Sequence, residues 1–148
     1  MAVVLHPSFP ETDLARLLTI CILHDLGEAV HGDIPAPEQA ARGNKSAAER
    51  ADLVQFLKPL PAPLQAELVA VWDEYEAAST PEAQLAKALD KLETILQHNQ
   101  GANPSTFDYA FNLDYGREYT DVHPLLAELR TALDAMTARR SRDAQSNP

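Results

Sequence analysis

The sequence predicts an all-α fold. Several stretches repeat apolar residues three and four positions apart, which is the spacing of one face of an α-helix. No stretch alternates apolar and polar residues as a half-buried strand does, and no internal repeat is present. Proline and glycine punctuate the boundaries between the stretches, so we expect separate helices joined by loops.

The first expected helix covers residues 12–26. Its apolar residues recur at helical spacing and mark the face that we expect to meet the core: Leu14, Leu17, Leu18, Cys21 and Ile22. Gly27 is well placed to end this helix, because glycine adopts the left-handed conformation of a helix C-terminus without strain. A long loop rich in glycine and proline follows, and loops of such length in compact domains are often functional.

Helix start signals mark the later elements. Ser46 and Glu49 have the spacing of a capping box, and Thr80 before a proline is a second N-terminus signal. Trp72 and Tyr75 lie at core spacing between these two points, so we expect them to pack in the interior. The four later helices are expected at residues 46–57, 63–78, 80–98 and 122–139.

The chain has the length of one domain. With 148 residues, we expect a single domain over residues 1–139, incomplete at its N-terminus, and a disordered polar tail over residues 140–148. The net charge of −10 argues against a nucleic-acid polymer or an anionic membrane as partner. The lone Cys21 and the absence of an apolar run of about 18 residues favour a cytoplasmic location.

His24 and Asp25 follow the apolar row of the first helix. At roughly 100° per residue, Asp25 falls within about 20° of the Leu14–Leu18–Cys21 row, so we expect both side chains to face the core. A buried carboxylate must be paired, protonated or bound to a metal. Neutral imidazole and carboxylate are good ligands for divalent metals, and a hydrogen bond between the two side chains is the alternative.

The loop after this pair carries further polar groups. Glu28 and Asp33 add two carboxylates, and such a cluster is reasonable where a cation offsets its charge. His31 could approach a substrate, although an exposed position without a ligand is the alternative. Three basic residues follow the loop and could meet a phosphate, with a solvated face as the alternative: Arg42, Lys45 and Arg50.

Asp90 gives a weaker signal. It lies about 140° from the centre of the leucine row on its helix, so periodicity alone favours a solvated aspartate. Lys87 and Lys91 lie further round and are expected to face solvent. The remaining histidines are expected in turns or at a helix end rather than in a metal site: His6, His98 and His123.

Three segments resemble the HD-domain phosphohydrolases, and within them the 5'-deoxynucleotidase branch. They are residues 22–28 with Gly32-Asp33-Ile34, residues 71–76, and residues 89–97. The bare His-Asp pair is weak evidence, but its combination with the Gly-Asp pair and a distal Leu-Asp-Lys helix is fairly specific. The resemblance implies an HD-domain-like helical bundle.

The resemblance also implies a reaction. It implies one divalent metal ion (Mn, Co, Mg, Zn or Fe), held by a histidine, the His24–Asp25 pair and Asp90. Glu28 and Asp33 match the family's active-site acids near the attacking water, the scissile phosphate and the sugar. The implied reaction is hydrolysis of a deoxyribonucleoside 5'-monophosphate to deoxynucleoside and phosphate. The implied partner is therefore a small nucleotide, and a homodimer is common in such families.

One departure affects this expectation. Only 23 residues precede His24, whereas the resembled family takes its first metal-ligand histidine from an earlier helix. His6 lies in a proline-flanked turn, and Met1–Leu5 resembles the end of that earlier helix, so we expect the first ligand to be missing and the chain as given to be impaired. The alternatives are a non-catalytic nucleotide-binding or scaffold protein, or an HD phosphohydrolase with another phosphoester substrate.

Overall fold

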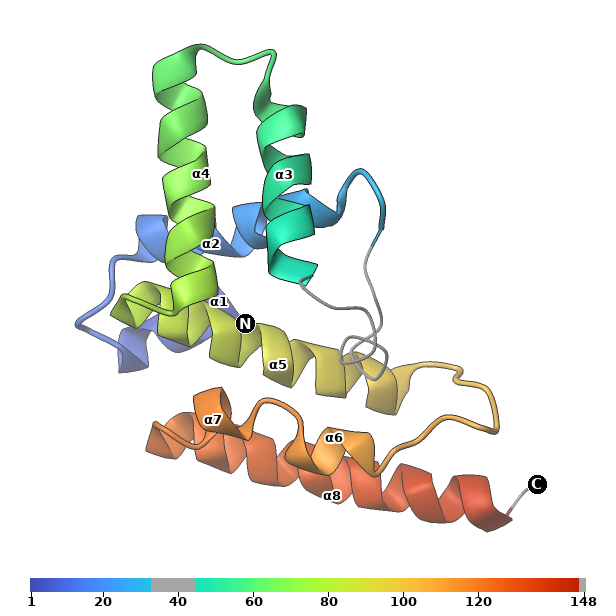
Figure 1. The fold of residues 1–148 in the computed structure, drawn as a ribbon. Helices are drawn as coiled ribbons and strands as arrows, with labels where there is room; N and C mark the ends of the chain where they lie inside the picture. Colours follow the sequence, from blue (N-terminus) through green and yellow to red (C-terminus); the bar gives the residue numbers. More distant parts are fainter. Residues whose placement is uncertain (33–44, 147–148) are drawn as a thin grey trace. The chain divides into compact units, whose positions relative to one another are not determined.

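A computed structural model describes residues 1–32 and 45–146, and over these residues every regular element is a helix (Figure 1). The prediction of an all-α fold is confirmed. The α-helices are α1 Ala2–Leu5, α2 Leu14–Leu23, α3 Lys45–Leu57, α4 Ala62–Ala77, α5 Pro81–Gln100, α6 Phe111–Asp114, α7 Arg117–Thr120 and α8 Pro124–Ser146, and two 3₁₀ helices, η1 and η2, cover His6–Ser8 and His24–Glu28. Within the described ranges, none of these helices combines the length and apolarity needed to cross a membrane.

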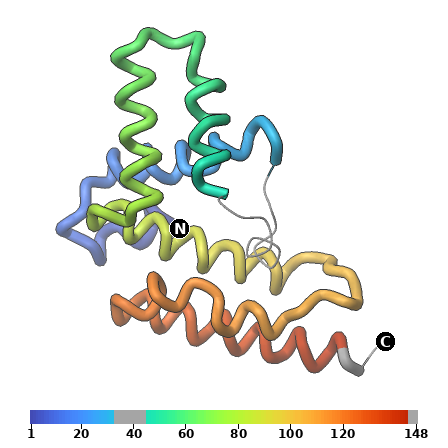
Figure 2. Tube along the Cα trace, viewed as in Figure 1, coloured from blue at the N-terminus to red at the C-terminus, as the bar shows by residue number. Residues whose placement is uncertain are grey.

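The chain divides into two compact units, residues 1–86 and residues 87–148. The boundary falls inside α5, so the first unit contains α1 to α4 and the second contains α6 to α8. In the first unit, α3 and α4 pack against each other, and α2 contacts α4 (Figures 1 and 2). The centre of this packing is a fully buried cluster of Leu53, Leu57 and Trp72.

The first helix is shorter than predicted. Asp13 caps α2, because its carboxylate accepts a hydrogen bond of 2.8 Å from the backbone N–H of Arg16. The α-helix ends at Leu23 and continues as η2, so Gly27 does not end it in a left-handed conformation. Gly27 is buried in η2 and serves close packing instead.

The buried face of α2 is also different from the predicted one. Its buried residues are Leu17, which was predicted, and Ile20 and Leu23, which were not. Of the other predicted residues, Leu14, Leu18 and Cys21 are only partly buried, and Ile22 is exposed. The Leu14–Leu18–Cys21 row lies about 130° from this buried face around the helix axis. Periodicity located an apolar helix correctly but identified only Leu17 of its three buried residues.

An ion pair connects α2 and α4 within the first unit. The guanidinium of Arg16 donates to the carboxylate of Glu74, with an Nε–Oε2 distance of 3.0 Å. Thr80 donates its hydroxyl to the other oxygen of Glu74 at 2.6 Å and accepts from the backbone N–H of Ala83 at 3.2 Å. Thr80 is therefore the predicted cap of α5 and also an anchor for Glu74.

In the second unit, α6 and α7 both contact α8, and Figure 2 shows them as the orange stretch along it. A fully buried arginine of α8, Arg130, makes this contact specific. It donates to the backbone oxygens of Asn112, Leu113 and Tyr115 at 2.6, 2.7 and 2.7 Å, and to a carboxylate of its own helix. Burying this guanidinium is tolerable because each of its three nitrogens has an acceptor.

Helix α8 continues beyond the predicted end at residue 139. The guanidinium of Arg140 donates to the backbone oxygen of Gly101 at 2.6 Å and lies 5.6 Å from the ring of Tyr109. These contacts stabilise the last turns of α8, and propensity alone does not reveal them. Whether residues 1–139 form a single domain stays a prediction.

Candidate functional site

The residues that sequence analysis placed at the centre of the site occur in η2. A 3₁₀ helix has three residues per turn, so His24 and Gly27 fall on one side of η2, and Asp25 and Glu28 fall on another. The first side packs inward, because a Cβ atom on Gly27 would lie only 2.8 Å from the backbone oxygen of Glu49 in α3. Glycine at this position therefore allows η2 to approach α3 closely.

A hydrogen bond of the His24 ring fixes its tautomer. Its Nδ1 lies 2.9 Å from the backbone oxygen of Cys21, and a carbonyl can only accept, so Nδ1 carries the proton. The other ring nitrogen, Nε2, lies 3.1 Å from Oδ1 of Asp25. The imidazole nitrogen and the carboxylate oxygen thus lie within hydrogen-bond distance, which fits both a pair that binds a cation and the alternative of a hydrogen bond between the two side chains.

Two side chains of α4 hold His24 in this position. The indole N–H of Trp72 donates to the backbone oxygen of His24 at 3.1 Å. The ring of Tyr75 lies 4.7 Å from the imidazole ring, at an interplanar angle of 49°. Both aromatics are buried, as predicted, but their positioning role was missed. The available signal was the indole N–H, since a buried tryptophan usually finds an acceptor.

The structure confirms the expected burial of His24 and contradicts that of Asp25. The side chain of His24 is 14% exposed, whereas that of Asp25 is 68% exposed. The physical reason is the side of α2 that faces the core: His24 continues the Leu17–Ile20 face, and Asp25 lies about 100° further round. An exposed carboxylate beside a held imidazole still suits a metal ligand, because it costs little to keep ionised.

Glu28 forms an ion pair with a residue that was expected to be solvated. Lys45 is the first residue of α3, and its Nζ lies 2.9 Å from Oε1 of Glu28 and 3.1 Å from Oε1 of Glu49. The side chain of Lys45 is 21% exposed, so the solvated-face alternative is wrong for it. Arg50 instead pairs with Asp73 at half-exposed positions, and Arg42 lies outside the described residues.

Asp33 also lies outside the described residues, so its predicted role stays untested. His31 is exposed, as its alternative reading required, and its Nδ1 lies 2.6 Å from Oδ2 of Asp52 in α3. This contact connects the end of the described loop to α3. It leaves the predicted substrate-binding role of His31 open.

Asp90 lies in the second unit and is not a solvated aspartate. Its side chain is 24% exposed, and Nζ of Lys91 lies 2.9 Å from Oδ2. Lys91 also donates to the hydroxyl of Tyr115 at 3.0 Å and lies 4.9 Å from the centre of that ring. Burial alone would lower the pKa of Lys91, but the carboxylate of Asp90 and the hydroxyl of Tyr115 more than offset it and raise the pKa.

The prediction that Lys87 and Lys91 face solvent was wrong. Lys87 is 8% exposed, and its ammonium lies 5.7 Å from the ring centre of Tyr119. Helical periodicity placed both lysines away from the leucine row. It did not anticipate that the residues after α5 would cover them with tyrosine rings.

The remaining histidines make structural contacts. His6 lies in η1, with Nε2 2.9 Å from the backbone oxygen of Thr12. His98 pairs with the side chain of Asn112 at 2.8 Å, and His123 accepts from the backbone N–H of Leu125 at 3.2 Å, at the start of α8. These contacts agree with their assignment to turns and helix ends.

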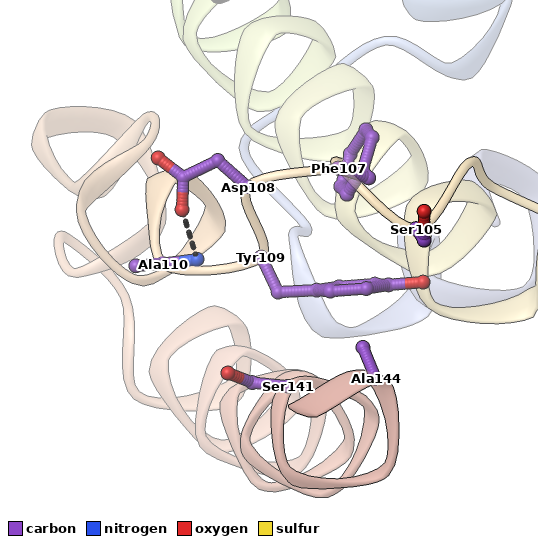
Figure 3. A pocket seen from close by; sticks show the side chains of 7 residues that line it. All are labelled: Ser105, Phe107, Asp108, Tyr109, Ala110, Ser141 and Ala144. Carbon is purple, nitrogen blue, oxygen red and sulfur yellow. Dashed lines mark hydrogen bonds between the residues drawn. The ribbon is translucent and has the colours of Figure 1, made fainter. Parts of the chain in front are cut away.

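The second unit contains a cavity of about 440 Å³ between the 105–110 segment and α8 (Figure 3). Tyr109 lies across it, with Phe107 and Ser141 nearby. The carboxylate of Asp108 accepts from the backbone N–H of Ala110 at 2.9 Å, which closes a local turn. The described lining contains no histidine or cysteine, so the His24–Asp25 pair remains the better candidate for a metal.

The donor chemistry of this pair fits a divalent ion. A histidine whose Nδ1–H donates to a carbonyl presents Nε2 as a ligand. Metal-bound histidines usually donate their other ring N–H to a carbonyl or carboxylate in this way. In residues 1–32 and 45–146, no three His, Cys, Asp or Glu side chains form a metal-binding group. His24 and Asp25 therefore form part of a ligand set that needs further donors.

Comparison with known proteins adds a family. A family model described as an HD domain matches residues 1–130. The 5'-deoxynucleotidase HDDC2 of Danio rerio is 35% identical over 85 residues, which cover 57% of this chain and 42% of that protein. The Homo sapiens protein of the same name is 28% identical over 137 residues, covering 90% and 66%. The 5'-deoxynucleotidase hdd1 of Schizosaccharomyces pombe is 40% identical over 92 residues, covering 60% and 46%. The aligned residues thus span about half the length of these curated relatives.

Proposed function

The chain belongs to the HD-domain family, and we propose that it is a metal-dependent phosphohydrolase that cleaves deoxyribonucleoside 5'-monophosphates into deoxynucleoside and phosphate. The names of the similar proteins support the substrate class. The observation that carries the proposal is the 3.1 Å approach of Nε2 of His24 to Oδ1 of Asp25, with Nδ1 held by a carbonyl.

His24, Asp25 and Asp90 are the proposed metal ligands. The first two lie together in the first unit; Asp90, in the second unit, is proposed from the family resemblance alone. A divalent ion held by these residues would neutralise charge on the phosphoryl oxygens and lower the pKa of a bound water. Its identity is proposed as Mn, Co, Mg, Zn or Fe.

Glu28 and Asp33 are the proposed acid–base residues. Glu28 falls on the same side of η2 as Asp25, and its Oε1 accepts from Lys45; its carboxylate is proposed to orient the attacking water and to accept a proton from it. Asp33 and His31 are proposed to contact the substrate. The cytoplasmic location and the homodimer stay predictions.

The direct test is phosphate release by the purified chain. Four deoxynucleoside monophosphates (dAMP, dGMP, dCMP and dTMP) are offered beside AMP and p-nitrophenyl phosphate, each with added Mn²⁺, Co²⁺ or Mg²⁺ and with a chelator. We expect weak release from the deoxynucleotides that needs the metal, because His24, Asp25 and Asp90 alone form an incomplete ligand set. Asp25→Asn should lower kcat/KM by about 100-fold or more, because it removes a ligand charge.

Asp73→Asn is the matched control. It removes a carboxylate of the same unit that is half-exposed and paired with Arg50, so activity should stay close to that of the wild type. Release from p-nitrophenyl phosphate alone would favour a different phosphoester substrate. No metal-dependent release from any compound, with no metal retained by the purified protein, would favour the non-catalytic binding alternative and contradict the proposal.

A further inference from the structure

We propose that Lys45 is a positioning residue for Glu28, with Glu49 as its second anchor. The inference rests on the acid–base role proposed for Glu28 and adds a residue that acts through it. Lys45 lies 2.9 Å from Oε1 of Glu28 and 3.1 Å from Oε1 of Glu49. The three side chains are 21%, 20% and 18% exposed, so the cluster is largely shielded from water.

The backbone places these three groups together. Gly27 lies against the backbone of Glu49, since a Cβ atom there would approach its carbonyl oxygen to 2.8 Å. Glu28 follows Gly27 directly, so the two carboxylates extend from backbone segments in contact. Lys45 is one helical turn before Glu49 in α3, which is the i, i+4 spacing of a helical ion pair. The ammonium thus bridges η2 and α3 at the residue proposed to act on water.

The charges favour positioning over phosphate binding. A lysine between two carboxylates forms a group with a formal charge of minus one, which does not attract a phosphate dianion. A shielded ion pair instead restricts the rotamers of Glu28 and keeps its carboxylate on one side of η2. Precise placement of an acid–base group affects turnover more than substrate binding.

Arg50 provides the contrast within the same helix. Arg50 is the residue after Glu49 in α3. It pairs with Asp73 of α4 rather than with a residue of η2, and both side chains are half-exposed. Replacing either cation removes one charge from α3, but only Lys45 contacts Glu28. Arg50→Met is therefore the matched control for Lys45→Met.

The test is a double-substitution cycle of Lys45→Met and Glu28→Gln in the full chain. We expect Lys45→Met to lower kcat about 10-fold, with the KM for dAMP changed less than about twofold. Lys45→Arg should recover most of the lost kcat, and Arg50→Met should change it less than about twofold. In the Glu28→Gln background, Lys45→Met should have almost no further effect on kcat, because a positioning residue acts only through its target.

A second readout needs no activity. The unfolding equilibrium constants of the same four proteins should be non-additive by at least about threefold if Lys45 and Glu28 are coupled. An unchanged kcat for Lys45→Met, a raised KM with weaker inhibition by inorganic phosphate, or additive unfolding constants would each overturn the inference. Inactivity of the wild-type chain would instead count against the proposed function, while coupled unfolding would still support the Lys45–Glu28 contact.

Discussion

The two regions that carry the proposed metal ligands hold them by different forces. In the first unit, His24 contacts the carboxylate of its fellow ligand Asp25 and is also held by neutral groups: a backbone oxygen at Nδ1, the indole N–H of Trp72 and the ring of Tyr75. In the second unit, Asp90 is paired with the ammonium of Lys91, which the hydroxyl of Tyr115 also holds.

The difference follows from the charge of the ligand. A neutral imidazole can be buried against carbonyls and rings at little cost, whereas a partly buried carboxylate needs a cation nearby. Each unit thus orients its own ligand with contacts from within that unit. The two regions can therefore be perturbed separately, and changes to each should leave the contacts of the other intact.

The largest effect is expected from Arg130→Met in the second unit. The change removes donors from three backbone oxygens, among them that of Tyr115, and leaves Asp134 without one of its cations. Losing a buried, fully paired arginine should lower the free energy of unfolding by about 3–5 kcal/mol. Urea unfolding followed by far-ultraviolet circular dichroism measures this loss.

The single tryptophan makes this a test of the comparison. Trp72 lies in the first unit, so its fluorescence reports that region alone. The fluorescence transition should shift less than the dichroism transition, and Arg139→Met, at an exposed position of α8, should shift neither. Equal shifts of both signals would mean that the two regions unfold as one, and the comparison would fail.

Trp72→Phe perturbs the region around His24 in the first unit. It leaves the backbone oxygen of His24 without its indole donor and removes part of the packing around Leu53 and Leu57. We expect a loss of about 2–3 kcal/mol in the free energy of unfolding. The affinity for Mn²⁺ should fall about 10-fold, because the contact orients a proposed ligand.

Calorimetric titration of Mn²⁺ into metal-free protein measures this affinity. The control is Phe56→Leu, since Phe56 is an aromatic residue of α3 that is 50% exposed. An unchanged affinity for Mn²⁺ in Trp72→Phe would show that the indole contact supports the fold without orienting His24.

Tyr115→Phe is a smaller change in the region around Asp90 and Lys91. The variant keeps the ring beside the ammonium of Lys91 and removes only the hydroxyl that accepts its hydrogen bond. One such bond to a charged group contributes about 1.5–3 kcal/mol at most, and the retained ring should reduce the loss to about 1 kcal/mol. Tyr119→Phe is the matched control, because the ring of Tyr119 lies near Lys87 instead. A loss as large as that of Arg130→Met would mean that the hydroxyl has further partners in the fold.

Periodicity predicted most of the helices because each buries one apolar face. It also predicted that Trp72 and Tyr75 are buried. It failed for α2, where the true core face is Leu17–Ile20–Leu23, and that error placed Asp25 inside. A partly apolar helix has two candidate faces, and only its neighbours α4 and η2 decide between them.

The candidate site was harder to predict for a different reason. His24, Asp25 and Glu28 lie close in sequence, so local patterns revealed them. The contacts that hold them in place are not local in sequence: Lys45 lies 17 positions from Glu28, and Trp72 lies 48 positions from His24. Asp90 was recognised only through the resemblance, because the tyrosine that helps to hold Lys91 lies 24 positions later than Lys91. Such pairings depend on tertiary packing, which single-sequence patterns do not encode.

The smallest effect is expected from Glu74→Gln, which tests whether the neutral contacts around His24 depend on a charged tie. Burial would raise the pKa of Glu74, but hydrogen bonds from Arg16 and Thr80 more than offset it and hold the pKa below 4.5.

A carboxyl whose pKa is lowered on folding contributes stability above its unfolded pKa, and this contribution is lost as the pH falls through the folded pKa. The free energy of unfolding of the wild type should therefore exceed that of Glu74→Gln by about 1 kcal/mol near neutral pH, and the difference should disappear as the pH falls through the folded pKa of Glu74. Urea unfolding at a series of pH values measures it, with Glu67→Gln, at an exposed position of α4, as the control. A difference that persists in acid would mean that Glu74 stabilises the α2–α4 contact by packing, and the region around His24 would then be independent of charge.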